Sequence, residues 1–200
     1  MAKPIEFYFD FSSPYGYLAA QRIDEIAAEN RREVDWRPFL LGAVFKTTGG
    51  QPLLDIPMKG EYALRDLFRS ARLMDIPIAV PKNFPFMSVS ACRATYWLSE
   101  KDPEAGKALA LALYRAAFAE DRNIANPQGV AEVAADLGHD PDEVIAAVQD
   151  PRIKDLLKRE VDAAIGKGVF GSPYFIIDGE PFWGYDRLED IGVWLESGGW

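Results

Sequence analysis

Residues 5–15 read IEFYFDFSSPY, and this stretch decides the fold. Apolar residues occupy every second position in its first half, which is the period of a β-strand with one strongly apolar face. The Ser-Ser-Pro run at residues 12–14 then predicts a helix start, because serine caps helices and proline favours the first helical position. Apolar residues at helical spacing continue this helix through residues 17–26.

The middle of the chain is predicted to be almost entirely helical. A second strand is expected near residues 34–39, and residues 40–59, rich in Gly, Thr and Pro, predict a long irregular crossover. Three later helix starts carry an Asn-Pro or Asp-Pro pair, which combines a capping side chain with proline at the first helical position. Helices are expected at about 60–74, 88–100, 103–119, 127–137, 141–149 and 151–166.

The end of the chain returns to strands. A β-hairpin is expected from residues 174–178 and 181–183, joined by a tight turn at 179–180. A final helix is predicted to start at Asp186, with Glu189 completing a capping pattern.

This order of elements predicts an α/β fold, a thioredoxin-like domain with a large helical insertion. We assign residues 1–50 and 151–200 to the thioredoxin-like domain and residues 51–150 to the inserted helical subdomain. A chain of 200 residues can bury a sizeable core without help from a metal or a disulfide.

Composition excludes several classes of function. The formal net charge is -9, with 31 acidic against 22 basic side chains, which argues against a nucleic-acid partner. An apolar run long enough to span a membrane is absent from the sequence, and the N-terminus has no long apolar stretch after its single Lys, so we expect a cytoplasmic or organelle-matrix protein with no membrane partner. Cys92 is the only cysteine, which excludes an intrachain disulfide and a cysteine-based zinc site, and no metal is expected.

Two segments have residues suited to chemistry. Ser13 lies where a strand ends and a helix begins, and unpaired N–H groups and the helix dipole favour anions there. The alternative is that Ser13 only caps the helix. Ser172-Pro173 precedes a strand, and a cis bond there would turn the Ser172 backbone outward as an edge that pairs with an extended ligand. The alternative is an ordinary turn. We predict the cis bond, with the Ser172 backbone facing the helix start at Ser13-Pro14.

The motifs FDFxSPY near the start, and VFGxP with WGxDRL near the end, resemble the 2-hydroxychromene-2-carboxylate isomerase family. That family is similar to the kappa-class glutathione transferases, and both resemble the periplasmic disulfide oxidoreductases in fold. The segments PFLLGAVFK and PMKGEY also fit, so the resemblance covers essentially the whole chain.

The resemblance implies glutathione as the cofactor and Ser13 as the catalytic residue that faces its sulfur. Redox relatives have Cys-Pro-x-Cys where this chain has SPYG at residues 13–16, so thiol exchange on the protein is excluded. The reactive group would then be the sulfur of the cofactor, because a thiolate, not a thiol, is the nucleophile.

Further cofactor contacts are implied by position. The Ser172 backbone before Pro173 would pair with the cysteinyl unit of glutathione, Asp186 beside Tyr185 would bind the γ-glutamyl amino group, and Lys59 would bind a carboxylate. The alternatives are a helix cap for Asp186 and a surface position for Lys59. Tyr185 replaces a small hydroxyl residue of the relatives.

A second departure is Gly50, where many relatives have Asn. The resemblance gives weaker indications for the substrate. Asn83 falls in a segment that lines the substrate pocket of the isomerases, Phe84 and Trp183 suit the walls around a flat ring, and Lys46 suits a substrate carboxylate. A turn role for Asn83 and core positions for the two aromatic residues stay open.

Two other residues are expected to have no part in the chemistry. His139 follows Gly138 at a predicted helix end and is expected to be exposed, which gives no support to a Ser-His or Cys-His pair. Cys92 lies at apolar helical spacing and is expected in the core.

The expected function is a glutathione-dependent isomerase that converts 2-hydroxychromene-2-carboxylate to trans-o-hydroxybenzylidenepyruvate, in the catabolism of aromatic compounds. Glutathione thiolate, stabilised by Ser13, would add reversibly to a small aromatic carboxylate or other electrophilic substrate. The alternatives are a kappa-like glutathione transferase or peroxidase, and a non-catalytic thioredoxin-like module that binds peptides. A homodimer is expected from the relatives.

Overall fold

Strand β1 (Ile5–Phe9) lies inside a four-stranded sheet with the order β2-β1-β3-β4. The computed structural model describes residues 3–200. It pairs β1 parallel with β2 (Val34–Pro38) and antiparallel with β3 (Tyr174–Ile177). Strand β4 (Glu180–Trp183) pairs antiparallel with β3 at the edge.

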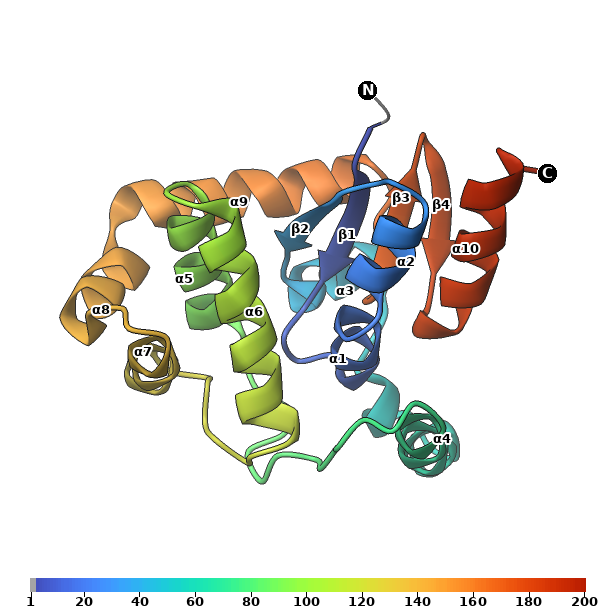
Figure 1. Ribbon diagram of the computed structural model, residues 1–200. Helices are drawn as coiled ribbons and strands as arrows, with labels where there is room; N and C mark the ends of the chain where they lie inside the picture. The colour runs from blue at the N-terminus through green and yellow to red at the C-terminus, as the bar shows by residue number, and fades with distance from the viewer. Residues whose placement is uncertain (1–2) are drawn as a thin grey trace.

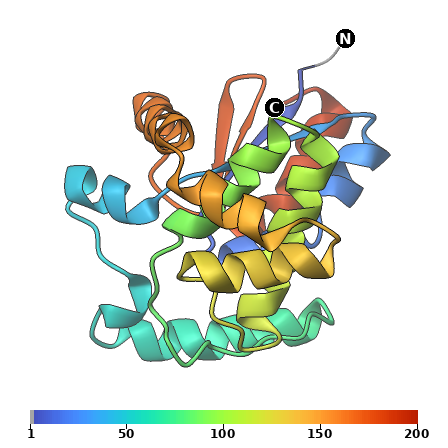
Figure 2. The same ribbon diagram turned by 90° about the vertical axis from the view of Figure 1, so that its left-hand side faces the viewer.

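Helices fill most of the chain between β2 and β3, as predicted, and Figures 1 and 2 show α4 along the end of the molecule opposite the N-terminus. Between residues 59 and 166 every described element is a helix. The division of the chain at residues 50 and 151 stays a prediction. The helices are α1 (Pro14–Ala20), α2 (Ile23–Glu29), α3 (Leu41–Thr48), α4 (Lys59–Leu73), α5 (Val89–Ser99), α6 (Pro103–Phe118), α7 (Pro127–Asp136), α8 (Pro141–Gln149), α9 (Pro151–Gly166) and α10 (Leu188–Ser197), with short 3-10 helices η1 (Leu53–Asp55) and η2 (Tyr185–Arg187).

One face of the sheet is aromatic. Phe7 stacks on Phe9 and Phe175, with ring centroids 4.9 and 5.2 Å apart. Trp36 packs edge-on against Phe7, and its indole N–H donates to Asp24 of α2 at 3.1 Å. Helices α1, α2 and α10 lie on this side of the sheet (Figure 1). The expected apolar face of the first strand is confirmed.

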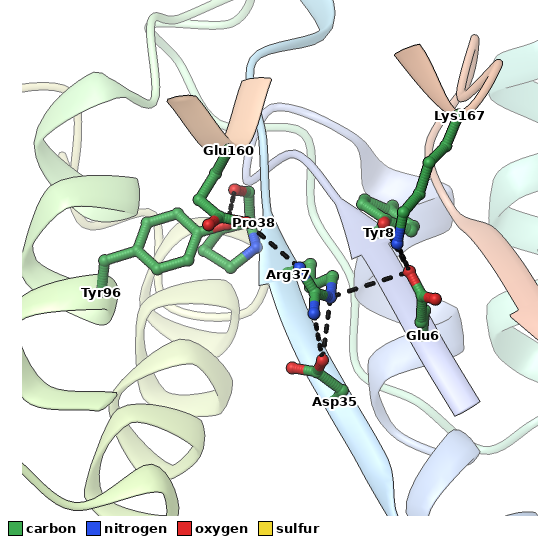
Figure 3. Close-up of polar contacts among 8 residues, drawn as sticks. All are labelled: Glu6, Tyr8, Asp35, Arg37, Pro38, Tyr96, Glu160 and Lys167. Carbon is green, nitrogen blue, oxygen red and sulfur yellow. Dashed lines mark hydrogen bonds and ion pairs between the residues drawn. The ribbon is translucent and has the colours of Figure 1, made fainter. Parts of the chain in front are cut away.

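The opposite face has a network of charges beneath α9 (Figure 3). The guanidinium of Arg37 lies between Asp35 on its own strand and Glu160 of α9, at 2.6 and 3.1 Å. Glu6 accepts from Lys167, just after α9, and from the Tyr8 hydroxyl. These ion pairs attach α9 to β1 and β2.

The prediction of an irregular crossover at residues 40–59 is wrong in its first half, where α3 forms. The N–H of Leu41, at the start of α3, donates to a carboxylate oxygen of Asp10 at 2.7 Å. Gly49 ends the helix in the left-handed region with φ of 72°. A cap supplied from 31 residues away leaves no local sequence signal.

Three boundaries also differ from the predictions. The first helix is interrupted after Ala20, and α2 begins at Ile23. The hairpin turns at Asp178 and Gly179, whose φ values of 53° and 100° suit a type I′ turn. The last α-helix begins two residues after Asp186, because residues 185–187 first form a 3-10 turn, so the predicted capping pattern is wrong.

None of the helices in residues 3–200 combines the length and the apolar character needed to cross a bilayer.

Candidate functional site

Ser13 is the N-cap of α1 and is 6% exposed. Its hydroxyl oxygen accepts from the Gly16 N–H at 3.0 Å, so the capping role is observed. The same hydroxyl donates to the backbone oxygen of Ser172 at 2.8 Å. The hydroxyl proton is therefore directed away from its own helix, toward the loop before β3.

That loop has the predicted conformation, since the Ser172-Pro173 bond is cis. The Ser172 backbone faces the start of α1 through the bond from Ser13, which confirms the predicted juxtaposition. The Ser172 hydroxyl accepts from the Asp10 N–H at 2.9 Å. Both sides of the site are thus fixed to the end of β1.

Gly16 occupies the position of the second cysteine in a Cys-Pro-x-Cys motif. A Cβ at Gly16 would lie 3.3 Å from the Ser13 Cβ, close to the spacing that a disulfide needs. The same Cβ would lie 3.0 Å from the Ser172 hydroxyl and still nearer to the hydroxyl of Tyr114. Tyr114 is fully buried and donates to the Asp10 backbone oxygen at 2.9 Å, so it cannot easily move. The chain therefore has no thiol at residue 13 or 16, and no space for a side chain at residue 16.

Sequence reasoning missed Asp10 as part of this site. It is 3% exposed, and its carboxylate accepts from Ser12, Leu41 and Ser88. A polar residue at the end of an apolar strand is the only local signal. Its partners come from distant segments that cannot be paired from one sequence.

Tyr185 joins the site through its ring. It stacks on Tyr15 of α1, with centroids 5.3 Å apart and planes 11° apart, and its hydroxyl contacts Ser70 of α4. The preceding Gly184 N–H donates to the Pro173 oxygen at 3.1 Å. Burial raises the pKa of Tyr15, and the negative charge of Asp66 raises it further. These contacts place Tyr185 between the cis-proline loop and α4.

The three predicted charged contacts lie on the surface. Asp186 pairs with Arg187 at 3.2 Å and lies next to Gly184, whose Cβ position its carboxylate covers. Lys59 is the exposed first residue of α4, and Lys46 is exposed in the last turn of α3. No polar contact links these three side chains to Ser13 within residues 3–200.

The other predicted substrate residues, Phe84, Asn83 and Trp183, lie in different surroundings. Phe84 lines a cavity of about 610 Å³ between η1, α4 and residues 78–85. Asn83 is exposed beside it and donates to Asn123 at 2.9 Å. Trp183 is 58% exposed and packs edge-on against Phe170, so a core position for Trp183 is wrong.

The structure also shows the surroundings of three residues to which no cofactor or substrate contact was assigned. Gly50 has the Phe45 ring 2.8 Å from its Cβ position, so a side chain there would require Phe45 to move. Cys92 is fully buried, which confirms its core position, and burial raises the pKa of its thiol. His139 is half-buried, so its expected exposure is wrong. The backbone N–H of His139 donates to the backbone oxygen of Ala134, which holds this residue against the end of α7.

The fold and the Ser13 junction, where Ser13 at the start of α1 meets the Ser172-Pro173 loop, define the class of protein. Residues 4–193 match the DSBA-like thioredoxin domain, and the chain belongs to that family.

Within it, the chain is similar over nearly its full length to two kinds of enzyme. It is 30% identical to glutathione S-transferase kappa 2 of Caenorhabditis elegans, over 96% of this chain and 92% of the relative. It is 28% identical to 2-hydroxychromene-2-carboxylate isomerase of Sphingobium xenophagum, over 98% and 99%. A solved structure of a 2-hydroxychromene-2-carboxylate isomerase superposes with a TM-score of 0.87 at 27% identity, over 96% of this chain and 94% of that one.

Proposed function

We propose that this protein is a glutathione-dependent isomerase of the 2-hydroxychromene-2-carboxylate type. The observation that carries the proposal is the bond from Ser13 to the Ser172 oxygen, which joins a hydroxyl at a helix N-terminus to the cis-proline edge. The full-length similarity to an isomerase and to kappa transferases supports it.

The polar groups around this junction fit glutathione. The Ser172 oxygen has a second lone pair, which can accept from a peptide N–H laid along the loop. The hydroxyl of Ser13 can turn from that oxygen toward a sulfur, while its oxygen still accepts from the Gly16 N–H. Pro173 and Tyr185 would bound the peptide, and Asp186 and Lys59 would bind its charged ends.

When bound, glutathione would supply a thiolate for reversible addition to the conjugated substrate. Ser13 would donate a hydrogen bond to the charged sulfur, and a bond to a charged partner is worth about 1.5–3 kcal/mol. The positive end of the α1 dipole would stabilise the same charge. Because neither residue 13 nor residue 16 is a cysteine, glutathione cannot form a mixed disulfide with the protein at these positions.

The second substrate would be a small aromatic carboxylate. Phe84 would contact its ring from within the cavity. Trp183, Asn83 and Lys46 do not line that cavity and would contact the parts of the substrate that extend beyond it, Trp183 the ring and the other two the polar groups. We also propose a homodimer, supported by the exposed apolar side chains of Leu53 in η1, Met58 just before α4 and Tyr62 in α4. A cytoplasmic location and a role in the catabolism of aromatic compounds complete the proposal.

One observation favours a kappa-like transferase as the second candidate. The residues that line the 610 Å³ cavity include one acid, Asp55, and no Lys, Arg or His within the described chain. A carboxylate in that cavity would have no cation partner. A neutral electrophile would suit it better.

Calorimetry with reduced glutathione and two activity assays test the proposal. We expect binding at millimolar concentration or below, and turnover of 2-hydroxychromene-2-carboxylate that regenerates glutathione. Turnover of a neutral aromatic halide to a conjugate, without isomerase activity, would favour the transferase. Absence of glutathione binding would contradict both and favour a peptide-binding module.

A further inference from the structure

A buried carboxylate without a cationic partner lies beneath the Ser13 junction. Asp10 is 3% exposed, and within residues 3–200 no Lys, Arg or His donates to it. One carboxylate oxygen accepts from the Ser12 N–H at 2.8 Å, the Ser12 hydroxyl at 2.9 Å and the Ser88 hydroxyl at 2.7 Å. The other accepts from the Leu41 N–H at 2.7 Å. Four neutral donors therefore compensate the charge that burial would otherwise penalise.

These donors belong to the beginnings of three helices. Ser12 precedes the N-cap of α1, Leu41 is the first residue of α3, and Ser88 is the N-cap of α5. The N-terminal end of a helix is its positive end, because its first N–H groups have no partner within the helix. A single carboxylate at the meeting point of three such ends holds them at fixed distances from one another.

The backbone of the same residue fixes both sides of the candidate site. The Asp10 N–H donates to the Ser172 hydroxyl at 2.9 Å, and the Asp10 oxygen accepts from the Ser13 N–H at 2.8 Å. Tyr114 donates to that oxygen as well, at 2.9 Å. A shift of Asp10 would therefore disturb the bonds that hold both Ser13 and Ser172 in place.

We infer that Asp10 is a positioning residue, which holds the Ser13 hydroxyl where it meets the sulfur of a bound thiol. The inference rests on the proposed function, because that function supplies the thiol whose sulfur the Ser13 hydroxyl would meet. The carboxylate is required because both of its oxygens accept bonds. An amide in its place would present its NH₂ group to a donor, either the Leu41 N–H or the Ser12 and Ser88 groups, whichever way it is turned.

The first test needs no ligand. In Asp10→Asn, hydrogen exchange of the backbone amides in residues 11–16 and 41–46 should become about tenfold faster or more, since a buried donor loses its acceptor. Asp102→Asn is the matched control, because Asp102 makes the same kind of side-chain cap at the exposed start of α6. It should leave both segments unchanged. Exchange in Asp10→Asn that equals wild type would overturn the inference.

The second test separates position from charge. If Asp10 positions Ser13, Asp10→Asn should raise the pKa of the bound glutathione thiol and lower kcat about tenfold or more, with a smaller change in the KM for glutathione. Ser88→Ala keeps the charge and removes one anchor, so it should shift both quantities in the same direction by less.

If the carboxylate acted only through its charge, removing an anion would lower the thiol pKa instead. A lowered or unchanged thiol pKa in Asp10→Asn, with kcat retained, would contradict the positioning role. Failure of the wild-type protein to bind glutathione would contradict the proposed function, and hydrogen exchange would then decide the role of Asp10 by itself.

Discussion

Gly16→Ala should destabilise the protein, although alanine is the better helix former. Alanine in place of glycine inside a helix normally gains about 1 kcal/mol. At position 16 the new methyl would lie within 3.0 Å of the Ser172 hydroxyl and nearer still to Tyr114. Tyr114 is buried and bonded to Asp10, so the crowding should cost about 1–3 kcal/mol. We expect a net loss of about 1 kcal/mol.

A double-mutant cycle isolates the cause. Tyr114→Phe alone should cost about 1 kcal/mol, since it removes one hydrogen bond to the Asp10 oxygen. In the double mutant the missing hydroxyl frees the space for the methyl group. The two changes should then couple favourably by about 1–2 kcal/mol.

Urea unfolding of the four proteins measures this coupling. Gly42→Ala in α3 is the matched control, because nothing lies within 4 Å of its Cβ position, and it should be neutral or stabilising. Additivity of Gly16→Ala and Tyr114→Phe within about 0.5 kcal/mol would refute the claim that Tyr114 fills the place of a second cysteine.

Two further outcomes follow from other parts of the structure. Cys92 should resist a thiol reagent in the native protein and react fully after unfolding, because it is buried with a raised pKa; rapid native labelling would contradict this. Burial alone would raise the pKa of Glu6, but bonds from Lys167 and Tyr8 and the charges of Lys167 and Arg37 lower it below 4.5. The ionised Glu6 should therefore add to the unfolding free energy above pH 4.5, and this contribution should be lost as the pH falls through the lower pKa of the folded state. Glu6→Gln should flatten this part of the pH profile of unfolding free energy. Equal acid profiles for wild type and Glu6→Gln would contradict that role.

The fold could be predicted because its signals are local. Alternation in residues 5–11 marks the central strand, and Asn-Pro and Asp-Pro pairs mark helices such as α7 and α8. The cis bond before Pro173 followed from the motif around it.

What could not be predicted depends on contacts between distant segments. Helix α3 begins with a cap from Asp10, and the final helix is delayed by the 3-10 turn at residues 185–187. The need for glycine at position 16 arises from Tyr114, which lies 98 positions further along the chain. The proposed roles of Lys46, Lys59 and Asp186 stay predictions.

The most direct test of the central claim is the ultraviolet absorbance of the thiolate of bound glutathione, followed against pH in wild type and Ser13→Ala. Loss of the cap should cost about 0.5–2 kcal/mol of unfolding free energy, which leaves the protein folded. Loss of a hydrogen bond to the charged sulfur, worth about 1.5–3 kcal/mol, should raise the thiol pKa by about 1–2 units and slow chromene carboxylate turnover by one to two decades. Glutathione affinity should fall less. If Ser13→Ala keeps both the wild-type titration and the wild-type turnover, Ser13 is only a helix cap and the proposed chemistry is wrong.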